Sequence, residues 1–166
     1  MSKADPAWEL RLHEIWQSID THDSQSFVAQ VEVLAAELPA HSAIGLFERG
    51  AAQDSTGRPD LAVPLYQAAL EAGLSGPHRR RATIQMASSL RNIGQAQRAA
   101  DLLSAELGAP PDELDGAVRA FLALTLVDLG REREAVAVSL AALSHYLPRY
   151  NRSLARYAAA LAVKAP

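Results

Sequence analysis

The chain has 166 residues, a formal net charge of −3 and a hydrophobic fraction of 49%. This length is enough for one domain that buries about 70% of its unfolded surface, so it needs no disulfide or metal ion to fold. Cysteine is absent, which excludes disulfides and thiolate chemistry and is typical of a reducing cytoplasm. A membrane-spanning helix needs an apolar run of about 18 residues, and no run in this chain is nearly that long. We therefore expect a cytoplasmic protein without membrane contacts.

Two helices are predicted between residues 6 and 39. Asp5 and Pro6 are a good helix start, because aspartate caps a helix N-terminus and proline fits the first turn. Apolar residues at helical spacing continue to Ile19, and a second apolar set begins at Phe27. We interpret this pair as a degenerate N-terminal repeat that covers the apolar face of the next repeat.

A pattern centred on a glycine then occurs three times, with Gly57, Gly94 and Gly130 as origins. Each origin has a small residue seven positions before it, an alanine five positions after it and a leucine thirteen positions after it. The origins are 37 and 36 residues apart, close to the period of about 34 residues in helix-turn-helix repeats. Each glycine should adopt a positive φ angle and end the first helix of a pair. The small residues should let the two helices pack closely, and the leucine should fill the space before the next pair.

The repeat spacing predicts how the rest of the chain is divided. We expect helices at 42–56, 60–72, 77–92 and 95–107, a further pair up to Pro148 and a final helix from about Arg149 to Val163. The whole chain, 1–166, is thus interpreted as a single domain. It comprises the degenerate pair at 6–39, repeats at 43–76, 80–110 and 116–148, and a capping helix at 149–164.

These repeats resemble those of tetratricopeptide repeat proteins. Stretches such as DSTGRPDLAVPLYQAALEAGL and FLALTLVDLGREREA are similar to a group of small bacterial members. The resemblance implies an all-α, right-handed α-solenoid of antiparallel helix pairs with a C-terminal capping helix. It also implies a non-catalytic scaffold for protein-protein interactions, which binds a peptide or protein segment in a concave groove lined by the first helix of each pair.

The second repeat supplies the positive charge of the implied groove. Arg81 and Arg91, together with Asn92, could hold a carboxylate of an acidic or C-terminal peptide by charge-assisted hydrogen bonds. Alternatively, Arg91 pairs with Asp54 or Asp128 and only ties neighbouring repeats together; the sequence leaves both interpretations open. The candidate site residues of the implied groove are Phe47, Asp54, Arg81, Ser88, Arg91, Asn92, Leu124 and Asp128. The resemblance also assigns Ala120 and Val127 of the third repeat to the groove.

Self-association is the alternative function. The final helix carries a stripe made of Tyr150, Leu154, Tyr157 and Leu161, which either packs on the last repeat or is covered by a second copy. Residues 1–76 hold eleven acidic and four basic residues, whereas residues 77–166 hold eight acidic and twelve basic residues. Opposite charges on the two halves could bring two copies together as a homodimer.

The sequence offers no catalytic motif. His13 and Glu14 begin like a zinc-binding HExxH motif, but Gln17 stands in place of the second histidine. There is no nucleophile elbow and no phosphate-binding loop, so we expect no enzyme activity, cofactor or metal ion. The basic run at 78–81 could contact phosphates, which makes nucleic-acid binding a lesser alternative function. We interpret the run as a solvated helix start instead, because a chain with a pI of about 5.9 is not typical of nucleic-acid binding.

Overall fold

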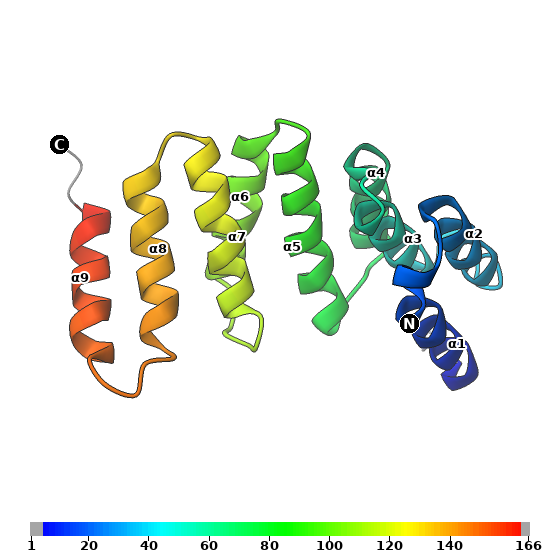
Figure 1. Cartoon of the computed structure of the whole chain (residues 1–166), viewed down its shortest axis with the longest axis horizontal. Helices are drawn as coiled ribbons and strands as arrows, with labels where there is room; N and C mark the ends of the chain where they lie inside the picture. The colour runs from blue at the N-terminus through cyan, green and yellow to red at the C-terminus, as the bar shows by residue number, and fades with distance from the viewer. Residues whose placement is uncertain (1–4, 164–166) are drawn as a thin grey trace. The chain divides into compact units, whose positions relative to one another are not determined.

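The computed structural model describes residues 5–163, and within this range it contains nine α-helices, one short 3-10 helix and no strand (Figure 1). The α-helices are α1 (Pro6–Gln17), α2 (Ser24–Ala35), α3 (Ala43–Ser55), α4 (Pro59–Glu71), α5 (Gly76–Asn92), α6 (Ala96–Leu107), α7 (Asp115–Asp128), α8 (Glu132–Ser144) and α9 (Asn151–Val163). The 3-10 helix, Ile19–Thr21, follows α1. The helices expected from the sequence are therefore present, close to their expected ends. Lys164, the last residue of the expected capping helix, lies outside the described residues.

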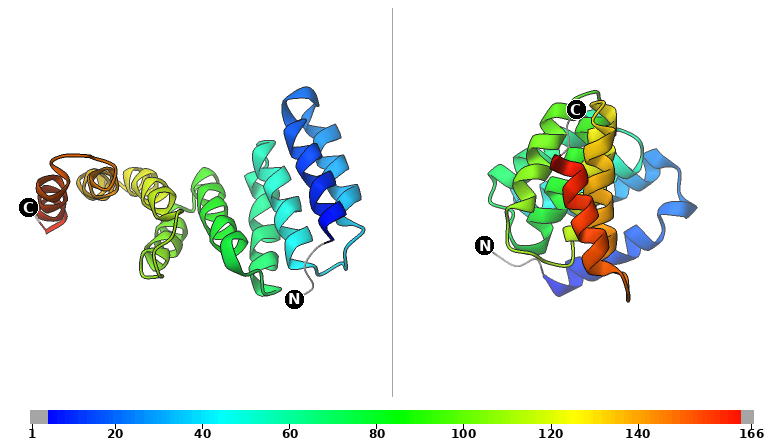
Figure 2. Two further views of the ribbon diagram at one scale, coloured as in Figure 1. Left: turned by 90° about the horizontal axis from the view of Figure 1, so that it is seen from below. Right: turned by 90° about the vertical axis from the view of Figure 1, so that its left-hand side faces the viewer.

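The backbone contacts divide the chain into an N-terminal unit, Met1–Ser89, and a C-terminal unit, Leu90–Pro166, with the boundary inside α5. In the N-terminal unit α2 packs between α1 and α3, and α3 pairs with α4 (Figures 1 and 2). In the C-terminal unit α8 lies between α7 and α9, and α7 also packs on α6 (Figure 1). The candidate binding surfaces are therefore described separately for each unit.

The three origin glycines close the turns inside the helix pairs, as predicted. Their φ angles are +79° at Gly57, +78° at Gly94 and +69° at Gly130. After each glycine the next backbone N–H donates back to a carbonyl five residues earlier, with Arg58 to Gln53, Gln95 to Leu90 and Arg131 to Leu126 all at 2.8 Å. This pattern satisfies carbonyl groups at the end of the first helix and reverses the chain.

The small residues predicted at the helix contacts are buried. Ala62 and Ala99 are fully buried and Ala135 is 4% exposed. A methyl group added to Gly50 would lie only 3.0 Å from the Tyr66 ring, so a side chain at this position would require the ring to shift. The prediction for the leucine at the end of each repeat is wrong in the third repeat, because Leu143 is 48% exposed.

Two tryptophans fasten α1 to its neighbours. The buried Trp8 donates its indole N–H to the Leu34 carbonyl of α2 at 2.9 Å. Trp16 donates to the Glu48 carboxylate of α3 at 2.9 Å, and its ring packs edge-on against Phe27 with centroids 5.1 Å apart. The N-terminal pair is thereby joined to the first repeat by hydrogen bonds as well as by apolar packing. The start of α1 also agrees with the sequence, since Asp5 accepts a hydrogen bond from the Ala7 N–H at 3.1 Å.

Candidate functional site

Phe47 belongs to the core of the N-terminal unit. Its side chain is fully buried, and its ring centroid lies 6.1 Å from that of Tyr66 and 5.6 Å from that of His78. The Arg81 guanidinium carbon stands 5.4 Å from the Phe47 centroid, in cation-π contact. A ligand could therefore meet the exposed Arg81 but not Phe47, which supports Arg81 from below.

Asp54 is held by hydroxyl groups from other helices. Its carboxylate accepts hydrogen bonds from Ser89 at 2.8 Å and from the Tyr66 hydroxyl at 3.4 Å. Burial raises the pKa of Asp54, and the two hydroxyl donors partly oppose this rise. Burial and the neighbouring Asp54 charge in turn raise the pKa of Tyr66. Asp54 thus links α3 to α4 and α5, and the nearby Ser88 is half-buried on α5.

Glu48 is a buried carboxylate that the sequence pattern did not single out. It is 5% exposed, and its hydrogen bond partner is the Trp16 indole. Burial raises the pKa of Glu48, while the Trp16 hydrogen bond and the Arg81 charge act in the opposite direction. No motif in the sequence marks this position, because the indole that satisfies it lies thirty-two residues earlier.

In the C-terminal unit, the end of α5 is tied to the end of α7 by an ion pair between Arg91 and Asp128. The Arg91 side chain is 27% exposed and that of Asp128 is 36% exposed. Asp128 is one of the two residues, with Asp54, that we considered as ion-pair partners of Arg91. Its carboxylate neutralises the Arg91 charge, which a ligand carboxylate would need for binding. Asn92, the residue that follows Arg91 in the sequence, is exposed.

The exposed face of α7 is apolar next to that ion pair. Leu124 is 47% exposed and Val127 is 50% exposed, and Ala120 is also exposed one turn earlier. The spacing of three and four residues places these side chains on one face of the helix. The groove positions predicted on α7 therefore present hydrocarbon to solvent.

The basic run at 78–81 does not form one solvated patch. Arg80 is only 4% exposed, and Arg79 is half-buried. His78 stands against the Phe47 ring, where burial and the Arg81 charge lower its pKa. The expectation of a solvated helix start is thus wrong for Arg80, and a phosphate-binding patch would lack this side chain.

The predicted stripe on α9 divides into two parts. Tyr150 and Tyr157 are 78% and 59% exposed, whereas Leu154 and Leu161 are half-buried. The Arg156 guanidinium carbon lies 5.5 Å from the Tyr157 centroid. Only the leucines follow the expectation that the stripe packs on the last repeat, and the tyrosines remain in solvent.

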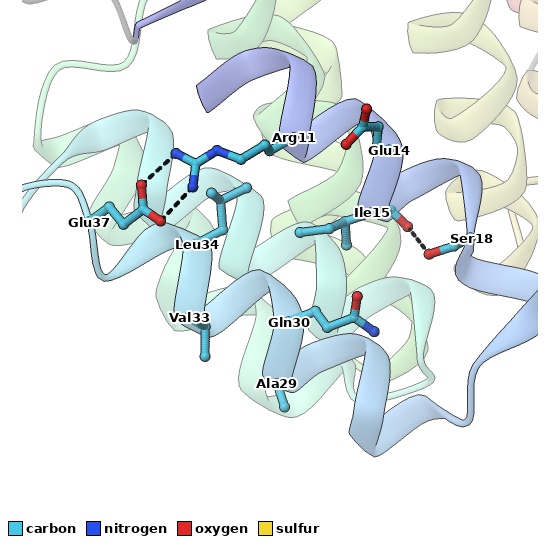
Figure 3. A pocket seen from close by; sticks show the side chains of 9 residues that line it. All are labelled: Arg11, Glu14, Ile15, Ser18, Ala29, Gln30, Val33, Leu34 and Glu37. Atoms are coloured by element: carbon cyan, nitrogen blue, oxygen red, sulfur yellow. Dashed lines mark hydrogen bonds and ion pairs between the residues drawn. The ribbon is translucent and has the colours of Figure 1, made fainter. Parts of the chain in front are cut away.

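A hollow of about 570 Å³ lies between α1 and α2, and no feature of the sequence pattern indicated it (Figure 3). Ile15 and Leu34 form part of its apolar lining, and Val33, which also lines it, is 70% exposed. The full lining is Arg11, Glu14, Ile15, Ser18, Ala29, Gln30, Val33, Leu34 and Glu37. This surface combines an apolar floor with charged side chains.

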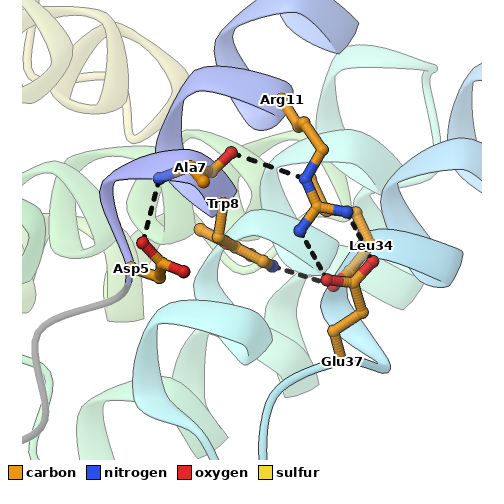
Figure 4. Close-up of polar contacts among 6 residues, drawn as sticks. All are labelled: Asp5, Ala7, Trp8, Arg11, Leu34 and Glu37. Carbon is orange, nitrogen blue, oxygen red and sulfur yellow. Dashed lines mark hydrogen bonds and ion pairs between the residues drawn. The ribbon is translucent and has the colours of Figure 1, made fainter.

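The polar edge of the hollow is held in place by a bidentate ion pair. The Arg11 guanidinium donates to both Glu37 oxygens, at 2.7 and 2.5 Å (Figure 4). The same guanidinium contacts the Ala7 carbonyl at 3.4 Å, beside the Trp8 hydrogen bond to α2 (Figure 4). The hydrogen bonds favour the charged form of both partners, so the pKa of Glu37 is lowered and that of Arg11 is raised.

Among residues 5–163, no three histidine, cysteine, aspartate or glutamate side chains gather so that they could hold a metal ion. In the same range no helix is both long and apolar enough to cross a membrane.

Comparison with known families identifies the fold. The family model described as "Tetratrico peptide repeat" matches residues 43–161, well over half of the chain. The chain belongs to the tetratricopeptide repeat family. The matched segment begins at α3 and excludes α1 and α2. The family resemblance drawn from the glycine-centred repeats is thereby confirmed, as is the all-α fold of helix pairs.

Two solved structures share this fold. One, MamA MSR-1 C2, has a TM-score of 0.62 and 22% sequence identity, and the match covers 90% of this chain and 78% of that one. The other, a mutant of MamA, has a TM-score of 0.58 and 24% identity, and the match covers 79% of this chain and 73% of that one. No curated protein sequence matches the chain. At these identities the structural likeness supports the fold alone.

Tetratricopeptide repeats are protein-interaction modules built from stacked helix pairs. The chain is accordingly a scaffold of this general kind, from a family that is for the most part non-catalytic. Its partners are expected among proteins and peptides. The surfaces described above are the places where such a partner could bind.

Proposed function

We propose that this protein is a non-catalytic, cytoplasmic scaffold that holds a segment of another protein against α7 of the C-terminal unit. One observation carries the proposal: α7 exposes Leu124 and Val127, at 47% and 50%, on the first helix of a repeat. Large apolar side chains grouped on one helix face are typical of a protein-binding surface.

The charges beside this face point to the chemistry of the partner. Because Asp128 already pairs with Arg91, the C-terminal unit offers no strong carboxylate clamp at this position. Burying this face would release water from Leu124, Val127 and Ala120. The partly exposed Arg91–Asp128 ion pair beside the face could supply hydrogen bonds. We therefore propose an amphipathic segment, bound mainly through apolar side chains, rather than an acidic one.

The groove positions of the N-terminal unit offer a different chemistry. Phe47 and Asp54, the groove positions of the first repeat, are engaged in contacts within the fold. Arg81 is exposed above Phe47 and is the residue through which an acidic group on a partner would be attracted. Its replacement by alanine should therefore affect partners that carry an acidic group and spare neutral ones.

Val127→Asp tests the proposal. A carboxylate in the middle of the apolar face must be desolvated on binding, so we expect partner affinity to fall at least tenfold, since one buried unpaired charge costs more than about 1.4 kcal/mol. The measurement is capture of partners from the source cell lysate on the immobilised protein, followed by titration of each captured partner.

Val136→Asp is the matched control. Val136 is also a valine, is 49% exposed, and lies on α8 of the same unit. Both variants should keep the melting temperature of the wild type, because both side chains are at the surface. Partners that bind the wild type and Val136→Asp but not Val127→Asp support the α7 site. Equal capture by all three proteins, or none by the wild type, contradicts it.

A further inference from the structure

The charges on the surface of this chain are separated along the sequence. Residues 5–37 carry seven acidic residues and one arginine, a formal charge of −6. At the other extreme, no acidic residue follows Glu134, while Arg149, Arg152 and Arg156 lie at or within α9. The most acidic stretch therefore forms α1 and α2, and the basic stretch forms α9.

The acidic stretch contains the hollow between α1 and α2. Its apolar lining includes Ile15, Val33 and Leu34, and Glu14 and Glu37 lie among them (Figure 3). α2 uses its other side to pack on α3, burying Phe27 and Val31 in that contact. The hollow is thus a second, solvent-facing apolar surface of the same helix pair, and its volume of about 570 Å³ can accept large side chains.

The basic stretch carries side chains of matching character. Tyr150 and Tyr157 are 78% and 59% exposed, and Arg156 stacks beside the Tyr157 ring. Tyr150 also has a φ angle of +66°, in the left-handed region that is unfavourable for an aromatic residue. The Tyr150 carbonyl accepts hydrogen bonds from the Leu154 N–H and from the Ser153 hydroxyl, both at 2.9 Å, so the start of α9 holds this conformation. The Tyr150 ring is left in solvent.

We propose that α9 of one copy of this protein docks into the α1–α2 hollow of a second copy. Tyrosine rings enter the apolar floor, and the arginines approach Glu14 and the net negative charge of the α1–α2 stretch, since Glu37 is already paired with Arg11. This charge complementarity favours α9 as the partner. Pairing of two α9 helices is disfavoured, because it would bring three arginines against three others. The contact is therefore between two different surfaces, and each copy carries one of each.

Sedimentation velocity on purified protein tests this interface with two variants. Val33→Asp places a charge in the hollow, and Tyr157→Asp places one on α9. We expect the wild type to form larger species as its concentration rises, and each variant alone to remain monomeric. An equimolar mixture of the two variants should form a 1:1 complex that grows no further, because one intact hollow meets one intact α9.

The control is Leu61→Asp, at a 39% exposed position on α4, which should associate like the wild type. High salt should weaken the association, because it screens the arginine-carboxylate attraction. Three results would overturn the proposal: a wild type that stays monomeric at every concentration, a Val33→Asp variant that still self-associates, or a variant mixture that stays monomeric. Because only purified protein is used, the outcome is independent of the partner proposed for α7.

Discussion

Glu48 and Asp54 are carboxylates on the inner side of α3, and each depends on donors from other helices. Asp54 could be predicted as a groove position from the repeat pattern, but its burial could not. The hydroxyl groups that bind it come from Tyr66 and Ser89, and their directions depend on how α4 and α5 pack on α3. Phe47 illustrates the same limit, because Arg81 and His78, which cover it, lie on a later helix.

Glu48→Gln should stabilise the protein at neutral pH. The folded-state pKa of Glu48 is raised by burial, so the ionised side chain opposes folding above that pKa, and the penalty disappears as the pH falls toward the ordinary value of about 4.3. Glutamine is neutral at every pH and can still accept the Trp16 hydrogen bond. Urea unfolding should therefore show a gain at pH 7 that shrinks toward pH 5.

The exposed Glu14→Gln serves as the control for this pH series and should leave stability unchanged. A Glu48→Gln variant whose stability follows that of the wild type at every pH would mean that burial does not govern the ionisation of Glu48.

At the scale of the helices, the sequence specified most of the fold. The origin glycines could be predicted because a chain reversal with positive φ favours glycine, and all three have that conformation. The end of each repeat was less predictable. Leu143 repeats the leucine of the earlier units, but it is 48% exposed although α9 packs on α8.

Gly57→Ala should destabilise the N-terminal unit by about 1 kcal/mol, because an alanine side chain at φ +79° meets its own backbone. Beyond residue 57 itself and its two chain neighbours, no atom lies within 4 Å of the added methyl group, so the effect comes from the φ angle. Gly108→Ala is the matched control, since Gly108 ends α6 with an ordinary φ of −82°. Urea denaturation midpoints compare the two, and equal midpoints would show that the turn tolerates alanine.

At the scale of the whole molecule, the sequence showed that acidic and basic residues are unevenly distributed. It did not show which surface could use this difference in charge. The hollow in the acidic stretch lies between α1 and α2, which Trp8 and Arg11 join through contacts to the Leu34 carbonyl and to Glu37. These contacts join residues twenty-six positions apart, and no repeat pattern predicts them. The exposed apolar face of α7, by contrast, falls on positions that the family resemblance had assigned to the groove.

The measurement that tests the scaffold proposal most directly is site-specific photo-crosslinking in the source cells. A photoreactive amino acid replaces Val127 in one variant and Val136 in another, two positions of equal exposure on α7 and α8. We expect a defined partner to crosslink at position 127 and not at position 136. Crosslinks to the same proteins at both positions, or at position 136 alone, would contradict the assignment of the binding surface to α7.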